Sequence, residues 1–178
     1  MTELTSALTA PEFFVYCPKC ATPLVTKLVN GKPRRVCPGC SYVHYVDPKV
    51  AVGVLVVENG RLLLVRRAMN PRKGKWSIPA GFVDSGEDPQ ETAVREALEE
   101  TNLEIVITGL EDVIFNDYGK SGEAGASIFI IYQAKLMGGQ LQAGDDADDA
   151  RFFDIQNLPE LAFTSTDQVI KKLKAAKN

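Results

Sequence analysis

Three glutamates stand close together in one segment of the chain, at a spacing that would bring their carboxylates together on a helix. They are Glu96, Glu99 and Glu100, and at about 100° per residue they fall within roughly one-third of a helix circumference. Carboxylates three and four residues apart repel one another unless a positive charge compensates. Arg95 can reach Glu99, but one arginine cannot neutralise three glutamates. Magnesium or manganese, which prefer oxygen ligands, would suit the cluster.

A helix is needed to hold these glutamates, and the sequence marks its start, its end and its packing face. Asp88-Pro89-Gln90-Glu91 combines a capping Asp, a proline suited to the first helical position and the spacing of a capping box. Asn102 suits the end of the helix, because Asn tolerates the left-handed conformation. The less polar residues fall opposite the glutamates and are expected to pack on a sheet: Val94, Ala97, Leu98 and Thr101.

The alternative is that the three glutamates form an ordinary solvated face, which would be the default for acids on an isolated helix. The preceding sequence favours a site instead. Pro79-Ala80-Gly81 ends an apolar run beside Trp76, and Gly81 and Gly86 permit a tight loop that leads Glu87 toward the same helix.

This segment resembles the Nudix box, which reads G-x5-E-x7-R-E-U-x-E-E-x-G-U, where U is a bulky apolar residue. The residues at its spacing are Gly81, Glu87, Arg95, Glu96, Glu99 and Glu100. Two positions depart from the pattern, since Ala97 is small for the first U and Asn102 replaces the glycine. The resemblance extends over residues 48 to about 173, and the cysteine segment before it resembles the zinc ribbon that precedes some Nudix domains.

The resemblance implies an α+β fold, an αβα sandwich with a mixed sheet, that hydrolyses a nucleoside diphosphate linked to another group. It implies that Glu96, Glu99 and Glu100 bind catalytic Mg2+ or Mn2+, and that Glu96 or Glu99 is the general base. Glu87 would hold a metal or support the loop, and Arg95 would orient Glu99. Gly81 is counted among the substrate-binding positions. Which glutamate acts as the base stays open.

Four cysteines, Cys17, Cys20, Cys37 and Cys40, form two C-x2-C pairs separated by sixteen residues. This spacing is typical of a zinc site in which four thiolates close a tetrahedron and leave no position for a substrate. The alternatives are two disulfides, which a reducing cytoplasm disfavours, and a redox pair, which is not expected twice in one short segment. We therefore expect a structural Zn2+, with His44 at the surface or at the junction and not among the ligands.

Turn residues and apolar runs divide the chain into an arm over residues 1–11, a zinc ribbon over 12–46 and a Nudix hydrolase domain over 47–178. Asn30-Gly31 predicts a hairpin tip in the ribbon, and Asn59-Gly60 predicts another in the domain, between β-rich runs at 50–57 and 61–67. Further strands are expected at about 104–116, 126–136 and 151–154. An amphipathic helix is expected after 164–167, with Val169, Ile170 and Leu173 inward.

Composition limits the compartment and the partners. The net charge of −3 and the pI near 5.3 disfavour general nucleic-acid binding, which usually needs a basic domain. The N-terminus lacks the basic start and apolar run of a signal peptide, and no stretch reaches the roughly 18 apolar residues that span a bilayer. We expect a cytoplasmic protein with a nucleotide as its small-molecule partner and no membrane partner. A homodimer is possible.

Basic residues beside the second hairpin strand are candidates for contacts to substrate phosphates: Arg66 and Arg67, then Arg72, Lys73 and Lys75. A solvated loop is an equally good interpretation of each. Aromatic residues that could stack on a base or a flavin, with none assigned, are Phe82, Phe115, Tyr118 and Phe163.

The sequence that follows the box helps to distinguish between possible substrates. Ribbon-bearing Nudix enzymes that act on NADH are marked there by Ser-Gln-Pro-Trp-Pro-Phe-Pro, whereas this chain has Phe115-Asn116-Asp117-Tyr118-Gly119-Lys120. The chain looks more like the ribbon-bearing Nudix proteins that cut ADP-ribose and FAD to release AMP, with NADH as a related dinucleotide. The alternatives are a hydrolase of RNA caps or nucleoside triphosphates, and a non-catalytic Nudix nucleotide sensor.

Overall fold

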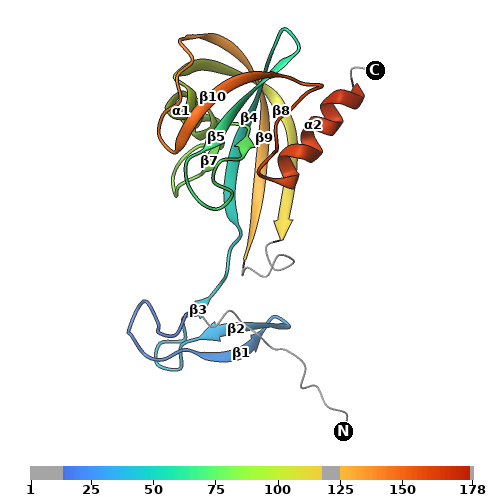
Figure 1. The fold of residues 1–178 in the computed structure, drawn as a ribbon. Helices are drawn as coiled ribbons and strands as arrows, with labels where there is room; N and C mark the ends of the chain where they lie inside the picture. The colour runs from blue at the N-terminus through green and yellow to red at the C-terminus, as the bar shows by residue number, and fades with distance from the viewer. Residues whose placement is uncertain (1–13, 118–124, 177–178) are drawn as a thin grey trace. The chain divides into compact units, whose positions relative to one another are not determined.

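The computed structural model describes residues 14–117 and 125–176, and the chain divides into two compact units near Pro48 (Figure 1). The arm expected over residues 1–11 lies outside the described residues, as do Tyr118, Gly119 and Lys120. Neither helix among the described residues has the length and apolar character needed to cross a bilayer.

The first unit is a small antiparallel sheet in the order β1-β2-β3, with β1 over Val25–Val29, β2 over Lys32–Val36 and β3 over Val43–His44. Asn30 and Gly31 form the expected hairpin tip and both have positive φ, 52° and 72°. This conformation suits the tight turns whose twist matches that of the flanking strands. Its described core contains Cys17, Leu24 and Cys37 with Tyr42 packed against them, too little apolar surface to fold without further help.

The second unit is built on a mixed sheet whose main strands follow the order β10-β5-β4-β9-β8. Strand β4 pairs parallel with β9 along its length and antiparallel with β5 and β7 on its other side. The strands are β4 Lys49–Glu58, β5 Arg61–Arg67, β6 Trp76–Ser77, β7 Ala80–Phe82, β8 Leu103–Asp117, β9 Ala126–Gly139 and β10 Ala147–Asp154. The expected strands and the Asn59-Gly60 hairpin are confirmed, and the strands extend a few residues beyond the expected limits.

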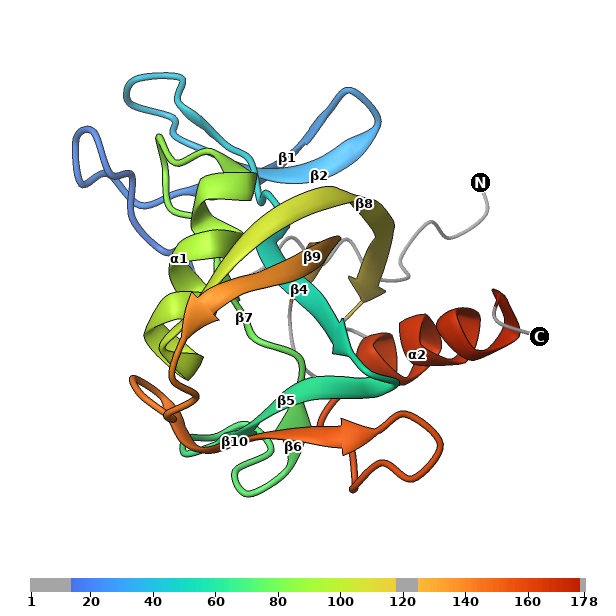
Figure 2. The same ribbon diagram turned by 90° about the horizontal axis from the view of Figure 1, so that it is seen from above.

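Helices α1 (Pro89–Thr101) and α2 (Thr164–Ala176) cover opposite faces of this sheet, as Figure 2 shows. Alternation along β4 and β5 supplies both cores, because successive strand side chains point to opposite faces. One core packs Ala93 and Ala97 of α1 against side chains that include Val52, Val54 and Val56. The other packs Val169 and Ile170 of α2, as expected, with side chains that include Leu55, Leu62 and Leu64. The fold is the αβα sandwich that the sequence predicts.

Candidate active site

Local capping sets the register of α1 as the sequence predicts. The Asp88 carboxylate accepts hydrogen bonds from the backbone N–H groups of Gln90 at 2.8 Å and Glu91 at 3.3 Å. At the other end Asn102 adopts the left-handed conformation, with φ of 55°, and its N–H donates to Leu98 O at 2.8 Å. These caps satisfy backbone groups that a helix end otherwise leaves unpaired.

The face of α1 that packs on the sheet differs from the expected one. Its buried residues are Thr92, Ala93, Ala97, Glu100 and Thr101. The prediction that Leu98 packs on the sheet is wrong, because its side chain is 46% exposed. The buried residues span about 180° of the helix circumference, and Leu98 lies outside this arc, about 150° from its middle. Glu100 lies near the middle of this arc and is 4% exposed, so it faces the protein interior and not open solvent.

The buried Glu100 carboxylate is held by strand β7. Its Oε2 accepts a hydrogen bond from the backbone N–H of Ala80 at 3.0 Å. Burial raises the pKa of the Glu100 carboxyl to about 9, and the Asp146 carboxyl beside it adds to the increase, while the Ala80 hydrogen bond opposes it. Glu100 is therefore a crowded, poorly solvated carboxyl, the kind of group that a cation stabilises in its ionised form.

Asp146 is the residue that sequence reasoning missed. It precedes β10 in the acidic run 145–149, and the backbone brings this run to the end of α1, where Gly144 N donates to Glu100 O at 3.2 Å. The acidic run was the available signal, but nothing local in the sequence connects it with α1. The fold thus adds a fifth carboxyl to the four glutamates of the box.

Arg95 lies among three carboxylates at the exposed side of α1. Its Nη1 is 2.8 Å from Glu99 Oε2 and 2.9 Å from Glu96 Oε1, and its Nη2 is 3.3 Å from Glu87 Oε2. The sequence predicted the contact with Glu99, and the structure adds the contacts with Glu96 and Glu87. Glu87 also accepts from the backbone N–H of Asp84, the main reason that its pKa is lowered. The loop from β7 therefore delivers Glu87 to the same face of the helix.

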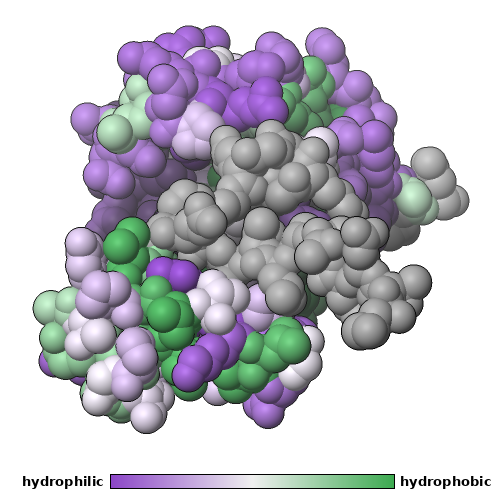
Figure 3. Space-filling model, turned by 90° about the horizontal axis from the view of Figure 1, so that it is seen from below, coloured by the Kyte–Doolittle hydropathy of each residue, from purple (hydrophilic) through white to green (hydrophobic). Residues whose placement is uncertain are grey.

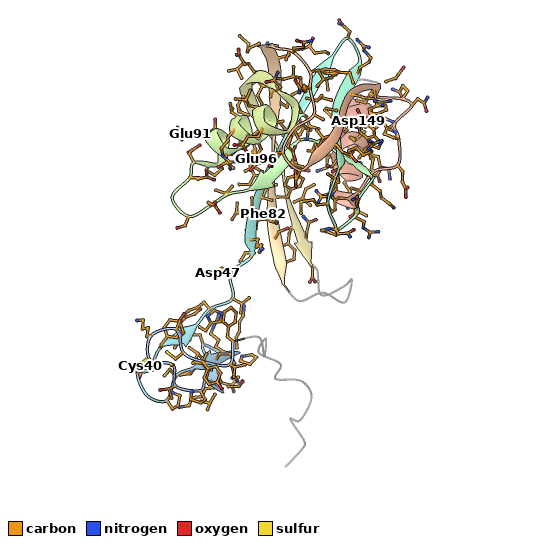
Figure 4. All side chains as sticks on the ribbon, turned by 60° about the vertical axis from the view of Figure 1, so that its left-hand side comes forward. Cys40, Asp47, Phe82, Glu91, Glu96 and Asp149 are labelled. Atoms are coloured by element: carbon orange, nitrogen blue, oxygen red, sulfur yellow. The ribbon has the colours of Figure 1, made fainter. Side chains whose placement is uncertain are left out.

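Gly81 lets α1 come close to β7. A Cβ built on Gly81 would lie 2.0 Å from Glu96 Cδ, so any side chain there would displace the Glu96 carboxylate. Burial raises the pKa of Glu96, and the charge of Arg95 opposes this rise. Figure 4 shows Glu96 on α1 and Phe82, the exposed neighbour of Gly81, near one another.

The donor set on α1 and its flanking loops consists of carboxylates, whose oxygen atoms are the ligands that a hard divalent cation prefers. Burial raises the pKa values of Glu96 and Glu100, and a bound cation would stabilise the ionised form of both groups. Within residues 14–117 and 125–176, only the four cysteines bring three or more ligand atoms within 4.8 Å of one another. The carboxylates of α1 are engaged by Arg95 and by the Ala80 N–H group.

Arg66 and Arg67, the candidate substrate contacts on β5, both have partners within the protein. Arg66 Nε lies 2.6 Å from Asp148 Oδ1, and its guanidinium lies over the Trp76 ring. Arg67 Nε donates to Pro71 O at 2.8 Å, and its guanidinium lies over Phe163. The Asp148 contact ties Arg66 to the acidic run that contains Asp146.

The other basic candidates lie elsewhere. Arg72 and Lys75 line a cavity of about 600 Å³ whose other walls come from residues 156–164 and from α2. No residue of α1 lines this cavity, and Lys75 pairs with Glu160 at 2.5 Å. The structure therefore separates Arg72 and Lys75 from the glutamate helix, although the sequence grouped them as candidates for the same substrate.

The four cysteines of the first unit converge as the zinc interpretation requires. Cys17 Sγ lies 3.6 Å from Cys40 Sγ, and Cys20 Sγ lies 3.5 Å from Cys37 Sγ. A tetrahedron with Zn–S bonds of about 2.3 Å has sulfur–sulfur edges of about 3.8 Å. A disulfide would need a separation of about 2.05 Å, so the cysteines are free thiols and the disulfide alternative does not apply.

The two cysteine pairs have the same backbone conformation. Ala21 N donates to Cys17 O at 2.8 Å, and Ser41 N donates to Cys37 O at 3.0 Å. Ala21 and Ser41 both have positive φ, 57° and 58°. His44 is not part of the sulfur cluster, and its ring packs on Phe14 with centroids 3.6 Å apart. The arrangement is that of a closed structural metal centre with four sulfur ligands.

Two known protein families match this sequence, one for each unit of the chain. Residues 47–173 match the family described as NUDIX domain, and residues 15–46 match the family described as Nudix N-terminal. The chain belongs to the Nudix family. It is a Nudix pyrophosphohydrolase with an N-terminal zinc ribbon, and this family typically uses divalent cations.

Several relatives resemble this Nudix chain along most of its length. It is 40% identical over 138 residues to the ADP-ribose pyrophosphatase of Methanocaldococcus jannaschii, covering 77% of this chain and 79% of that protein. It is 31% identical over 148 residues to the NAD-capped RNA hydrolase NudC of Chromobacterium violaceum, covering 82% of this chain and 52% of NudC. This chain thus spans about half of that relative. A solved Nudix hydrolase of Nitrosomonas europaea superposes with a TM-score of 0.79 at 31% identity, covering 88% of each chain.

Proposed function

We propose that this Nudix enzyme hydrolyses the pyrophosphate linkage of ADP-ribose and related molecules such as FAD and NADH, and releases AMP. The similarity to the ADP-ribose pyrophosphatase of Methanocaldococcus jannaschii carries this proposal, because it covers more than three-quarters of both chains. In the reaction, water attacks one phosphorus and the bond from that phosphorus to the bridging oxygen breaks. ADP-ribose would give AMP and ribose phosphate, and FAD would give AMP and FMN.

We assign the box residues to this reaction. Glu96, Glu99, Glu100 and Glu87 would hold Mg2+ or Mn2+, which supplies charge neutralisation at the pyrophosphate and lowers the pKa of the attacking water. Glu96 or Glu99 would accept the proton of that water. Arg95 would orient Glu99, with which it pairs at 2.8 Å. Arg66, Arg67 and Gly81 remain the proposed substrate-binding positions, and Phe82 is exposed beside Gly81.

The physical state of the two candidate bases differs. Burial raises the pKa of Glu96, which moves it toward the range in which a carboxylate is an effective base near neutral pH. Glu99 is more exposed and is held by Arg95. The pH–rate profiles of Glu96→Gln and Glu99→Gln would separate the two, because only loss of the base should remove the acidic limb of the profile.

Hydrolysis of NAD-capped RNA is a second candidate, because the NudC of Chromobacterium violaceum aligns with 82% of this chain. The experiment that tests both measures kcat/KM with magnesium for ADP-ribose, FAD, NADH, NAD-capped RNA and the nucleoside triphosphates. We expect ADP-ribose or FAD to lead, with AMP as a product. A preference of about tenfold for a triphosphate, about 1.4 kcal/mol in the transition state, would contradict the proposal. No hydrolysis of any of them would support the nucleotide sensor.

A further inference from the structure

The acidic net charge of the chain conceals a basic segment, residues 14–46, within the first unit. Residues 14–46 contain five Lys and Arg and no Asp or Glu, whereas the rest of the chain contains the other 15 Lys and Arg and all 23 Asp and Glu. Four thiolates that hold Zn2+ carry a formal charge of −2, which leaves this segment at about +3. The argument from net charge against nucleic-acid binding therefore does not apply to this segment, because electrostatic attraction acts over about a Debye length, near 10 Å.

Three of these cations share one face of the β1–β2 hairpin. Lys27 is directly opposite Arg34, and Val29 is directly opposite Lys32. Residues two apart on a strand point to the same side, so Lys27, Lys32 and Arg34 line one face. Tyr45 lies on this face as well, with its ring 4.3 Å from the Arg34 guanidinium carbon. We call these four residues the basic face.

The cations of the basic face are not neutralised locally. Like charges directly opposite on neighbouring strands are destabilising, and Lys27 and Arg34 are such a pair. The segment has no carboxylate that could relieve them, and all the ion pairs found among the described residues lie in the second unit. Arg34 Nε is buried and has no hydrogen-bond partner within the described part of the chain. An external anion at the exposed ends of these cations would relieve their mutual repulsion.

Exposed aromatic rings accompany this charge. Tyr45 is 47% exposed and Tyr16 is 62% exposed. Figure 3 shows apolar and pale side chains at the surface of the first unit, where it comes into view in the lower part of the picture. Cations that bind phosphates and aromatic rings that stack on bases are the two components of surfaces that bind single strands without sequence preference.

We propose that the basic face binds single-stranded nucleic acid, with its phosphates at Lys27, Lys32 and Arg34 and a base stacked on Tyr45. An acidic peptide would satisfy the cations but would give the exposed tyrosine no planar partner. Nucleic acid satisfies both, so the charge and the aromatic ring together favour it. This binding does not depend on the hydrolytic activity, because the basic face lies entirely within the first unit.

The test measures binding of the full-length zinc-loaded protein to fluorescein-labelled single-stranded RNA and DNA of about twelve nucleotides, by fluorescence anisotropy without added magnesium. These probes contain no pyrophosphate, so the result is independent of the substrate proposal. We expect affinity to fall with salt, with a log–log slope of about −2 if three phosphates are neutralised at about 0.7 each. Comparable affinity for RNA and DNA would support binding through phosphates and base stacking alone. A preference for RNA would also support the proposal and would indicate an additional contact to the 2′-hydroxyl.

Two variants locate the binding. Lys27→Glu with Lys32→Glu changes two exposed side chains, and it should lower affinity about tenfold or more and make the salt slope shallower. Tyr45→Ala should lower affinity about fivefold or more through lost stacking. The matched control is Arg61→Glu with Lys135→Glu, which makes the same charge change at exposed positions of the second unit and should leave affinity within about twofold. Zinc content checks that each variant retains the ribbon.

Three results would overturn the proposal. The first is no measurable binding of either probe at low salt. The second is an equal loss of affinity in the control pair, which would reflect bulk charge alone. The third is displacement of the probe by polyglutamate at equal charge concentration together with an unaffected Tyr45→Ala, which would identify a site for acidic protein segments.

Discussion

The carboxylate of Glu96 lies against the backbone of Gly81, so that a Cβ on Gly81 would come within 2.0 Å of Glu96 Cδ. Gly81→Ala must therefore displace Glu96 or separate α1 from β7. We expect this change to lower kcat at least tenfold, because a shift of about 1 Å in a catalytic group can cost about a hundredfold. Gly109→Ala is the control, since a Cβ there meets nothing within 4 Å. Wild-type turnover in Gly81→Ala would show that Glu96 is not needed in its present position.

Replacement of Glu100 tests the proposed metal set. Glu100→Gln keeps an oxygen that can accept from the Ala80 N–H group, but it removes the charge, so we expect an intact fold and a kcat lowered by roughly two to three orders of magnitude. EDTA should abolish wild-type activity, and magnesium or manganese should restore it. Glu91→Gln, at an exposed position in the first turn of α1, should leave turnover unchanged. A Glu100→Gln enzyme as fast as the wild type would refute the assignment.

The stability of the metal-free protein should depend on pH through Glu100. The folded pKa of about 9 lies above the ordinary value of 4.5, so the folded state holds a proton that the unfolded state releases. The protonated Glu100 carboxyl makes its full contribution to the free energy of unfolding below about pH 4.5, and this contribution is lost as the pH rises toward 9. We expect the Tm without divalent metal to fall between pH 5 and 9 more steeply in the wild type than in Glu100→Gln. Parallel curves for the two proteins would disprove this.

A variant of the neighbouring carboxyl refines this experiment. Asp146→Asn removes a charge that raises the pKa of Glu100, so the fall in Tm between pH 5 and 9 should be shallower than in the wild type and steeper than in Glu100→Gln. Magnesium at pH 8 should raise the Tm of the wild type more than that of Glu100→Gln, because ligands that bind the folded state stabilise it.

The sulfur cluster predicts about one tightly held zinc ion per chain, measurable by elemental analysis of protein purified without added metal. Cys37→Ser should lower the zinc content and unfold the first unit, because its described core is too small to fold without the metal. Hydrolysis of ADP-ribose should persist in this variant, since the proposed catalytic residues lie in the second unit. Four thiols that react readily in the native protein would argue against zinc.

Local physics made much of this molecule predictable from the sequence. The Asp88 cap, the left-handed Asn102 and the Asn30-Gly31 and Asn59-Gly60 turns depend on residues within a few positions of one another, so their conformations follow from local sterics and hydrogen bonding. The box spacing and the two cysteine pairs are also local patterns. The sequence by itself therefore determined the family, the longer strands and both helices of the second unit, and the clustering of the four cysteines.

The tertiary structure decided what depends on contacts between distant segments. Burial of Glu100 and exposure of Leu98 depend on how α1 is rotated against the sheet, and the spacing of the glutamates allows more than one rotation. Asp146 reaches Glu100 because β10 pairs with β5 and so brings its preceding loop to the end of α1, a contact across 46 positions. The cross-strand register that sets Lys27 opposite Arg34 follows from the hairpin, but only the folded unit places Tyr45 against Arg34. Charge and spacing along a chain do not specify these neighbours, because sheet pairing and helix docking determine them.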